Sequence, residues 1–178
     1  MKHILGVSGS LRAASYNTAL LRAASEIGEP DLKVEIYDGL GRLPLFNVEL
    51  EENGFPAPVA DLRTAMAGAD GLLVATPEYN WSITGVLKNA IDWASRGPDS
   101  PLSHKPAAIL GAGGRFGTLR AQLHLREILG HNDVRLVSRP QLLLDAPAQR
   151  FDAELRLTDD RFRDQLGRLL DSLAALID

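Results

Sequence analysis

The sequence predicts an α/β protein in which a parallel β-sheet is covered by helices on both faces. Short apolar segments alternate with longer amphipathic segments five times along the 178 residues, which is typical of repeated strand–helix units. Parallel strands that are joined through helices need both faces of their sheet to be covered. The connections are expected to be right-handed, which leaves few possible arrangements of the strands.

Five strands are expected from the apolar segments. The first, HILGVS, is short and apolar, the second, LKVEIYD, alternates with a period of two, and the third, GLLVAT, is apolar almost throughout. The fourth, KPAAILGA, has a proline near its start, where a missing N–H is tolerated, and the fifth is DVRLVS. These segments are residues 3–8, 32–38, 71–76, 105–112 and 133–138.

The helices are expected where apolar residues recur at helical spacing. Three of them cover residues 15–27, 59–70 and 84–95. A fourth covers residues 118–130, with Gly130 as the residue that closes its carboxyl end. The last helix begins after an N-cap at Thr158 or Asp159 and runs to Ile177.

Five strands in this pattern are expected in the order 2-1-3-4-5, which makes the fold a flavodoxin-like three-layer sandwich. The sequence shows no linker, internal repeat or low-complexity segment, so residues 1–178 are expected to form a single domain. The longest stretch without an expected helix or strand is residues 39–58. A loop of that length inside a compact domain is usually a lid, an interface or a mobile flap.

The composition excludes several classes of function. The chain has no cysteine, which excludes thiol catalysis, disulfides and cysteine-based metal sites, and no metal site is expected. A formal net charge of −4 argues against a nucleic-acid partner, because phosphate binding needs clustered positive charge. The start, MKHILGVSGS, is unlike a signal peptide, and no apolar run has the length of a membrane helix. We therefore expect a cytoplasmic protein without a membrane partner.

Three loops are expected to meet at one edge of the sheet. In an open parallel sheet, ligands bind outside the carboxyl ends of the strands, where the strand order reverses. The loops after the first, third and fourth strands are SGSLRAASYN, PEYNWS and GAGGRFG, and all three are rich in polar residues or glycine. A binding site built from these loops is therefore expected.

The first loop has the composition of a phosphate site. Its small residues let backbone N–H groups approach an anion, and Ser10, Ser15 and Asn17 add polar side chains. Arg12 adds positive charge, and the following helix directs its positive end to the same place. The alternative is an ordinary turn in which Ser15 or Asn17 is only the helix cap.

The sequence of the first loop indicates which class of phosphorylated ligand it could bind. The loop lacks GxxxxGK[ST], the motif that binds nucleoside triphosphates, and GxGxxG, the motif that binds dinucleotides. Its serines also do not form the GxSxG motif of a serine hydrolase. Donors that are rich in hydroxyls suit a terminal monophosphate, which offers three oxygens. Flavin mononucleotide (FMN) presents such a group.

The second loop begins abruptly at Pro77, which cannot continue the ladder of the strand. Glu78, Tyr79 and Asn80 then lie at the carboxyl end of that strand, where a ligand is expected. Tyr79 could form a wall for a flat ring, and the backbone and side chain of Asn80 could meet the polar edge of that ring. The alternative is a hydrogen-bonded turn before the next helix, with Trp81 as a packing or interface residue.

The third loop, Gly111-Ala112-Gly113-Gly114, has almost no side chains. Such a segment can lie flat against a ring and offer backbone N–H groups to the carbonyl oxygens of the ring. Because glycine-rich turns are common, this expectation depends on the position of the loop beside the other two.

Three segments together resemble the NADPH-dependent FMN reductase family, which includes quinone, chromate and azo-dye reductases. They are GSLRAASYN, ATPEYNWSITGVLKNAIDWASR and GGRFGTLRAQLHLRE, and the resemblance extends from about residue 3 to about residue 140. It implies a flavodoxin-like fold, non-covalent FMN, and NADPH or NADH as the hydride donor. It also implies a small-molecule electron acceptor, and a homodimer that often pairs into a homotetramer with the flavin pocket near the dimer interface.

The resemblance further implies cofactor-binding residues on all three loops. The first loop would hold the phosphate end, PEYN would flank the isoalloxazine ring, and the third loop would face the pyrimidine side of that ring. The implied residues are Ser8, Ser10, Leu11, Arg12, Ser15, Tyr16, Asn17, Pro77, Glu78, Tyr79, Asn80, Ala112, Gly113 and Gly114. Many relatives carry serine or threonine in the third loop, whereas this chain has only glycine and alanine there, which leaves only backbone donors.

No catalytic residue is expected, because the cofactor carries the chemistry and the chain has no paired carboxylates or clustered histidines. The favoured function is an FMN-dependent NAD(P)H oxidoreductase with ping-pong kinetics. One alternative is a flavodoxin-type electron carrier without its own turnover, but such carriers dock through strongly acidic faces and a net charge of −4 is modest. Another is a phosphate-binding regulatory domain that uses the fold without flavin.

Overall fold

The computed structural model describes residues 1–28 and 30–178 and contains a central sheet with the strand order β2-β1-β3-β4-β6. Its first four strands are β1 (Lys2–Ser8), β2 (Leu32–Tyr37), β3 (Gly71–Ala75) and β4 (Pro106–Ala112). Every pairing in the sheet is parallel, and Val7 in the middle of the sheet lies opposite Tyr37 on one side and Val74 on the other. The expected parallel sheet with a flavodoxin-like strand order is confirmed.

The outer position of the sheet, expected as one strand over residues 133–138, is divided between two short strands. β6 (Arg135–Leu136) pairs with the start of β4, and β7 (Leu142–Leu144) pairs with its end. Pro140, which has no N–H to give to a ladder, lies between them. The expected single strand is therefore wrong in its extent, because much of the pairing with β4 comes from residues beyond Ser138.

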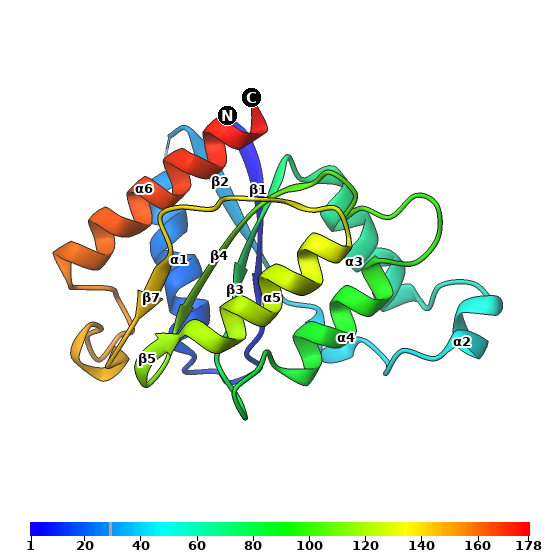
Figure 1. The fold of residues 1–178 in the computed structure, drawn as a ribbon, viewed down its shortest axis with the longest axis horizontal. Coiled ribbons are helices and arrows are strands. Elements are labelled where there is room, and N and C mark those ends of the chain that lie inside the picture. Colours follow the sequence, from blue (N-terminus) through cyan, green and yellow to red (C-terminus); the bar gives the residue numbers. More distant parts are fainter. Residues whose placement is uncertain (29) are drawn as a thin grey trace.

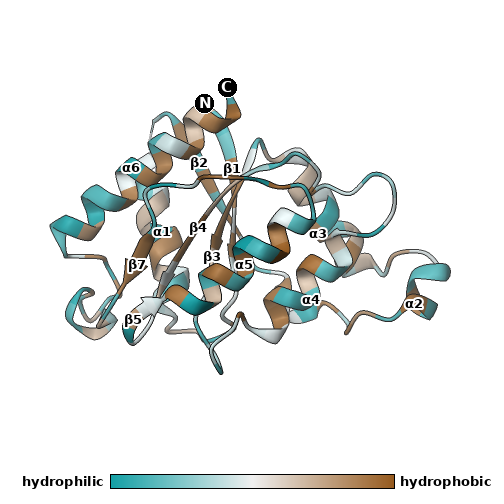
Figure 2. Ribbon diagram, in the orientation of Figure 1, coloured by the Kyte–Doolittle hydropathy of each residue, from teal (hydrophilic) through white to brown (hydrophobic). Residues whose placement is uncertain are grey.

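Two layers of helices cover the sheet (Figure 1). Helices α1 (Tyr16–Gly28) and α6 (Asp160–Ile177) share one buried core with the sheet, and α3 (Ala57–Gly68), α4 (Gly85–Ala94) and α5 (Leu119–His131) share the other. Figure 2 shows apolar strands between helices whose outward turns are hydrophilic. Within residues 1–28 and 30–178, every helix is too short or too polar to cross a lipid bilayer.

The ends of two helices refine the sequence expectations. α5 continues through Gly130 to His131, so the expectation that Gly130 closes this helix is wrong. The residue with a left-handed backbone is Asp133 (φ 60°), one of the residue types that tolerate this conformation. Of the two expected caps for α6, the structure has Asp159, whose carboxylate accepts a hydrogen bond from the N–H of Phe162 at 3.2 Å.

The long segment over residues 39–58 is attached to α4 and contains a 3₁₀ turn, Leu40–Arg42, and a short helix, α2 (Val48–Glu52). The N–H of Phe46 donates to Asn89 Oδ1 at 2.8 Å, and Asn89 Nδ2 and Trp93 Nε1 both donate to the carbonyl of Pro44, at 2.9 and 2.8 Å. Asn89 and Trp93 of the LKNAIDW segment therefore hold residues 44–46 against α4. α2 lies at the far edge of the molecule (Figure 1).

Two short elements adjoin the expected site. β5 (Arg115–Thr118) follows β4 after a turn at Gly113 and Gly114, where the sequence predicts only a loop. Gly117 of β5 has φ 60° and lies so close to β7 that an added Cβ would stand 2.8 Å from the carbonyl carbon of Leu143. A 3₁₀ turn, Pro147–Gln149, follows β7.

Candidate cofactor site

The three predicted loops line one cavity of about 260 Å³ at the carboxyl edge of the sheet. The first loop contributes Ser10, Arg12, Ser15, Tyr16 and Asn17, the second Pro77, Glu78 and Tyr79, and the third Ala112, Gly113 and Gly114. Three other predicted residues are outside this lining. Ser8 and Leu11 line a neighbouring hollow, and Asn80 lies in the turn beyond Tyr79.

The first loop presents Arg12 and the amino end of α1 to this cavity. Ser15 is the N-cap of α1, because its Oγ accepts a hydrogen bond from the N–H of Thr18 at 3.2 Å. Arg12 bends back so that its guanidinium donates to the carbonyl of Ala14, with Nε at 2.9 Å and with Nη2. The arginine is thus held at the mouth of the cavity, where its charge adds to the positive end of the helix.

Asn17 joins the first loop to the third. Its buried side chain makes two hydrogen bonds to the backbone of Ala112, donating from Nδ2 to the carbonyl at 3.0 Å and accepting from the N–H at Oδ1 at 2.9 Å. The carboxamide is therefore engaged by the protein itself. Its direct role is to fix the separation of the two loops that line the cavity.

Glu78 joins the second loop to α5. Its Oε2 accepts from the backbone N–H groups of Arg120 and Ala121, at 2.9 and 3.2 Å, and its Oε1 accepts from Arg120 Nη1 at 3.1 Å. Thr118, which precedes α5, makes no capping hydrogen bond with its own side chain. Glu78 therefore takes the place of the missing cap, and α5 holds the PEYN turn in position.

The residues after Glu78 form a two-residue turn with a left-handed backbone. Tyr79 and Ser82 exchange two backbone hydrogen bonds at 3.0 Å, and Asn80 (φ 49°) and Trp81 (φ 66°) lie between them. Positive φ at both central residues is the geometry of a type I′ turn, in which asparagine is favoured and tryptophan is uncommon. Trp81 is 67% exposed, and the guanidinium of Arg120 lies 4.2 Å from the centre of its ring.

The third loop has room for an added side chain only at its tip. An added Cβ would stand 1.9 Å from Thr118 Oγ1 at Gly111 and 2.6 Å from the carbonyl oxygen of Gly117 at Gly113. Nothing lies within 4 Å of the same position at Gly114. Glycine is thus required by packing at 111 and 113, while 114 faces open space at the cavity.

Two features of the site were missed by sequence reasoning. Pro147, which follows β7, also lines the cavity, and the sequence around it carries no recognisable motif. The role of Arg120 was missed too, since its partner Glu78 is 42 residues away. Its place in the first turn of a helix that follows a glycine-rich loop is the only signal that the sequence offered.

These residues fit a phosphorylated, flat ligand. The first loop supplies Arg12, hydroxyls and a helix amino end for the phosphate, while Gly114 and the PEYN turn leave open backbone beside the space for a ring. The fold and site therefore define a flavodoxin-like protein that binds a nucleotide monophosphate. The NADPH-dependent FMN reductase family model matches residues 2–149, and the chain belongs to that family.

Several known proteins are similar over nearly the whole chain. An NAD(P)H-dependent FMN reductase of Pseudomonas aeruginosa is 49% identical over 171 residues, which cover 96% of this chain and 92% of that protein. An NADPH:quinone oxidoreductase of Arabidopsis thaliana is 44% identical over 97% of this chain and 90% of its own length. The structure of a flavoenzyme NAD(P)H:(acceptor) oxidoreductase from Paracoccus denitrificans superposes with a TM-score of 0.91 and 31% identity, covering 99% and 97% of the two chains.

Family membership, together with these relatives, identifies the chain as an FMN-dependent NAD(P)H oxidoreductase. The alternative of a flavodoxin-type carrier without turnover is not favoured by these comparisons.

Proposed function

We propose that the protein is a cytoplasmic enzyme that passes electrons from NADPH or NADH to quinones, free flavin or similar small acceptors. The convergence of a phosphate-type loop, the PEYN turn and a glycine-rich loop on one cavity carries this proposal. FMN, when bound, accepts hydride from the nicotinamide and passes the electrons to the acceptor. One open face that serves both partners in turn predicts ping-pong kinetics.

In this proposal the first loop binds the phosphate and the other two loops orient the ring. Arg12 and the amino end of α1 supply positive charge, and Ser10 and Ser15 supply hydroxyls. Tyr79, which is 55% exposed, borders the face that the nicotinamide and the acceptor would approach. The backbone at Gly114 offers polar groups without a side chain in the way.

No side chain of the cavity is assigned as a general acid or base. Glu78 is the lining carboxylate, and both of its oxygens already accept hydrogen bonds from the start of α5. A group that is held in this way positions a loop, and its negative charge is already matched by Arg120. The protein therefore acts by binding, by orientation and by keeping one face of the ring accessible.

We also propose that the chain forms a homodimer that can pair into a tetramer. Several large apolar side chains are exposed. Leu45, Val48, Leu50 and Phe55 lie on and around α2, while Trp81 lies in the PEYN turn and Leu123 on α5. Light scattering should give two or four chains per particle, and Leu45→Ser or Trp81→Ser should each remove one level of association. A monomer at micromolar concentration would refute this assembly.

An absorbance spectrum tests the proposed function directly. The purified protein, or apoprotein titrated with FMN, should show flavin absorbance, and NADPH added under argon should bleach it rapidly. Admission of a quinone should then restore the oxidised spectrum. Binding of FMN without bleaching by NADPH or NADH would indicate an electron carrier, and failure to bind FMN would indicate a regulatory phosphate-binding domain.

A further inference from the structure

A second cavity of about 320 Å³ lies directly beside the proposed flavin cavity. The turn between β4 and β5 separates the two, since Gly113 and Gly114 line the first and Arg115 and Phe116 line the second. Its other walls come from β7, from the residue after it and from the first turns of α6, and include Leu143, Asp145, Arg161 and Gln165. A ligand that extends past the tip of the third loop would enter this cavity.

The second cavity is lined by two arginines and one aspartate, an excess of one positive charge. Within the described chain, neither Arg115 nor Arg161 has a carboxylate within 4.0 Å; each lies only over the ring of a neighbouring phenylalanine, at 5.6 and 5.7 Å. The acidic residue of the cavity, Asp145, is already paired with Arg150 at 3.5 Å. Two guanidinium groups are therefore available to an anion.

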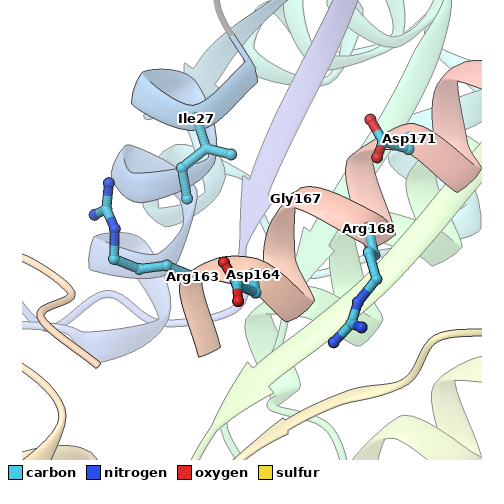
Figure 3. A pocket seen from close by; sticks show the side chains of 6 residues that line it. All are labelled: Ile27, Arg163, Asp164, Gly167, Arg168 and Asp171. Carbon is cyan, nitrogen blue, oxygen red and sulfur yellow. The ribbon is translucent and has the colours of Figure 1, made fainter. Parts of the chain in front are cut away.

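A different hollow on the same helix shows the contrast. It lies between α1 and α6 and contains Arg163 and Arg168 together with Asp164 and Asp171, so its charges balance. Figure 3 shows these two arginines pointing away from each other. The second cavity thus has an excess of arginine that this hollow lacks. A third hollow along α6, lined by Arg139, Arg168 and Asp171, has the same excess, but only the second cavity adjoins the third loop of the flavin site.

We propose that the second cavity binds the 2′-phosphate of the adenosine end of NADPH, with Arg115 and Arg161 as its ligands. The inference rests on the proposed function, which places the nicotinamide over the neighbouring cavity. The guanidinium groups suit a phosphate monoester, and the exposed ring of Phe116 provides a wall for the adenine. NADH lacks this phosphate, so the site selects NADPH.

Binding of adenosine phosphates tests the site without turnover. Calorimetric titration of the FMN-loaded protein should show 2′,5′-ADP binding about tenfold or more tightly than 5′-AMP, since the extra phosphate gains charge-assisted hydrogen bonds. Arg115→Gln and Arg161→Gln should each reduce this preference, and the double variant should abolish it. Arg168→Gln is the matched control, because it removes an arginine of α6 that lies outside the cavity.

The kinetic readout is the ratio of kcat/KM for NADPH to that for NADH. The ratio should fall about tenfold or more in Arg161→Gln, recover in Arg161→Lys and stay at the wild-type value in Arg168→Gln. Equal binding of 2′,5′-ADP and 5′-AMP by the wild type, or an unchanged preference in the double variant, would overturn the assignment. If NADPH fails to bleach the flavin while 2′,5′-ADP binds as expected, the proposed function fails and the phosphate site stands.

Discussion

Replacing Glu78 by alanine should loosen the PEYN turn and the start of α5 together. The carboxylate of Glu78 accepts hydrogen bonds from the N–H groups of Arg120 and Ala121 and from the guanidinium of Arg120. The side chain is largely buried, with 14% exposed, so water would not readily take over these bonds. Both ends of the contact lose their fixed position when the carboxylate is removed.

The expected loss of stability follows from these contacts. Loss of a helix cap costs about 1 kcal/mol, and loss of a negative charge at a helix amino end costs about 0.5 kcal/mol. The ion pair adds about 0.5 kcal/mol, a low value because the side chain of Arg120 is 36% exposed and solvent screens the interaction. The sum is about 2 kcal/mol, which corresponds to a fall in Tm of about 4–8 °C for a chain of this length.

Two measurements separate the effect on folding from the effect on the ligand. Urea unfolding of the flavin-free protein gives the stability, and fluorescence titration gives the affinities for FMN and for riboflavin. The affinity should fall similarly for both flavins, because Glu78 positions the turn beside the ring and lies away from the phosphate loop. Asp159→Ala is the matched control, since Asp159 also caps a helix and pairs with an arginine, Arg150, at 2.9 Å. It should lower stability while leaving both flavin affinities unchanged.

An unchanged urea midpoint in Glu78→Ala would refute this reasoning. If FMN affinity fell strongly at the same time, Glu78 would act on the ligand directly. If the midpoint fell but both affinities were retained, the PEYN turn would keep its place without α5.

Three further changes test other contacts. Arg12→Ala should weaken FMN by ~1.5–3 kcal/mol and leave riboflavin nearly unaffected, because riboflavin lacks the phosphate; equal losses in the two titrations would contradict the placement of the arginine. Asn17→Ala leaves the buried N–H and carbonyl of Ala112 without partners and should lower the free energy of unfolding by about 2–4 kcal/mol; a loss below about 0.5 kcal/mol in urea unfolding would show that the two loops do not depend on this bridge. Burial raises the pKa of Tyr37 above its ordinary 10.0, so the folded state holds this proton more tightly than the unfolded state. The contribution of Tyr37 to the free energy of unfolding is fully present below about pH 10 and is lost as the pH rises above that value. Urea unfolding of the wild type at about pH 9 and about pH 10.5 should show this loss, and the Tyr37→Phe variant should lack it. A wild type and variant with parallel pH curves would contradict the shift.

The sequence was sufficient to predict the order of the strands and the meeting of the three loops. Both follow from local periodicity and from the rule that ligands lie at the carboxyl edge of a parallel sheet. The contacts that hold the loops in place were not predictable in this way. Glu78 reaches a helix 42 residues further along the chain, and Asn17 reaches Ala112 across 95 residues. Contacts between residues so far apart in the chain produce no periodic pattern in a single sequence.

The same limit explains why Ser15 and Asn17 could not be told apart as caps. Both lie at the expected start of the first helix, and either type of side chain can cap a helix. Their neighbours in space decide the outcome, since the carboxamide of Asn17 is drawn into the buried contact with Ala112 and Ser15 remains to accept from Thr18. Only the folded arrangement of α1 against β4 supplies that information.

The glycines of the third loop differ in why they are glycine: two are required by packing, and one faces the cavity. Relatives with a hydroxyl in this loop cannot carry it at positions equivalent to 111 or 113 while keeping this backbone, because Thr118 and Gly117 occupy the space. Gly114 is the position where a side chain could enter the cavity. A ring bound as proposed would find no hydroxyl at this position. The N–H groups of Ala112 and Gly113 already donate to Asn17 Oδ1 and to the carbonyl of Leu144, so the backbone at Gly114 is left to stabilise negative charge on the pyrimidine side. The electron affinity of that ring in this chain would therefore depend on how closely the backbone at Gly114 approaches. The bridge from Asn17 to Ala112 holds the loop from its other side.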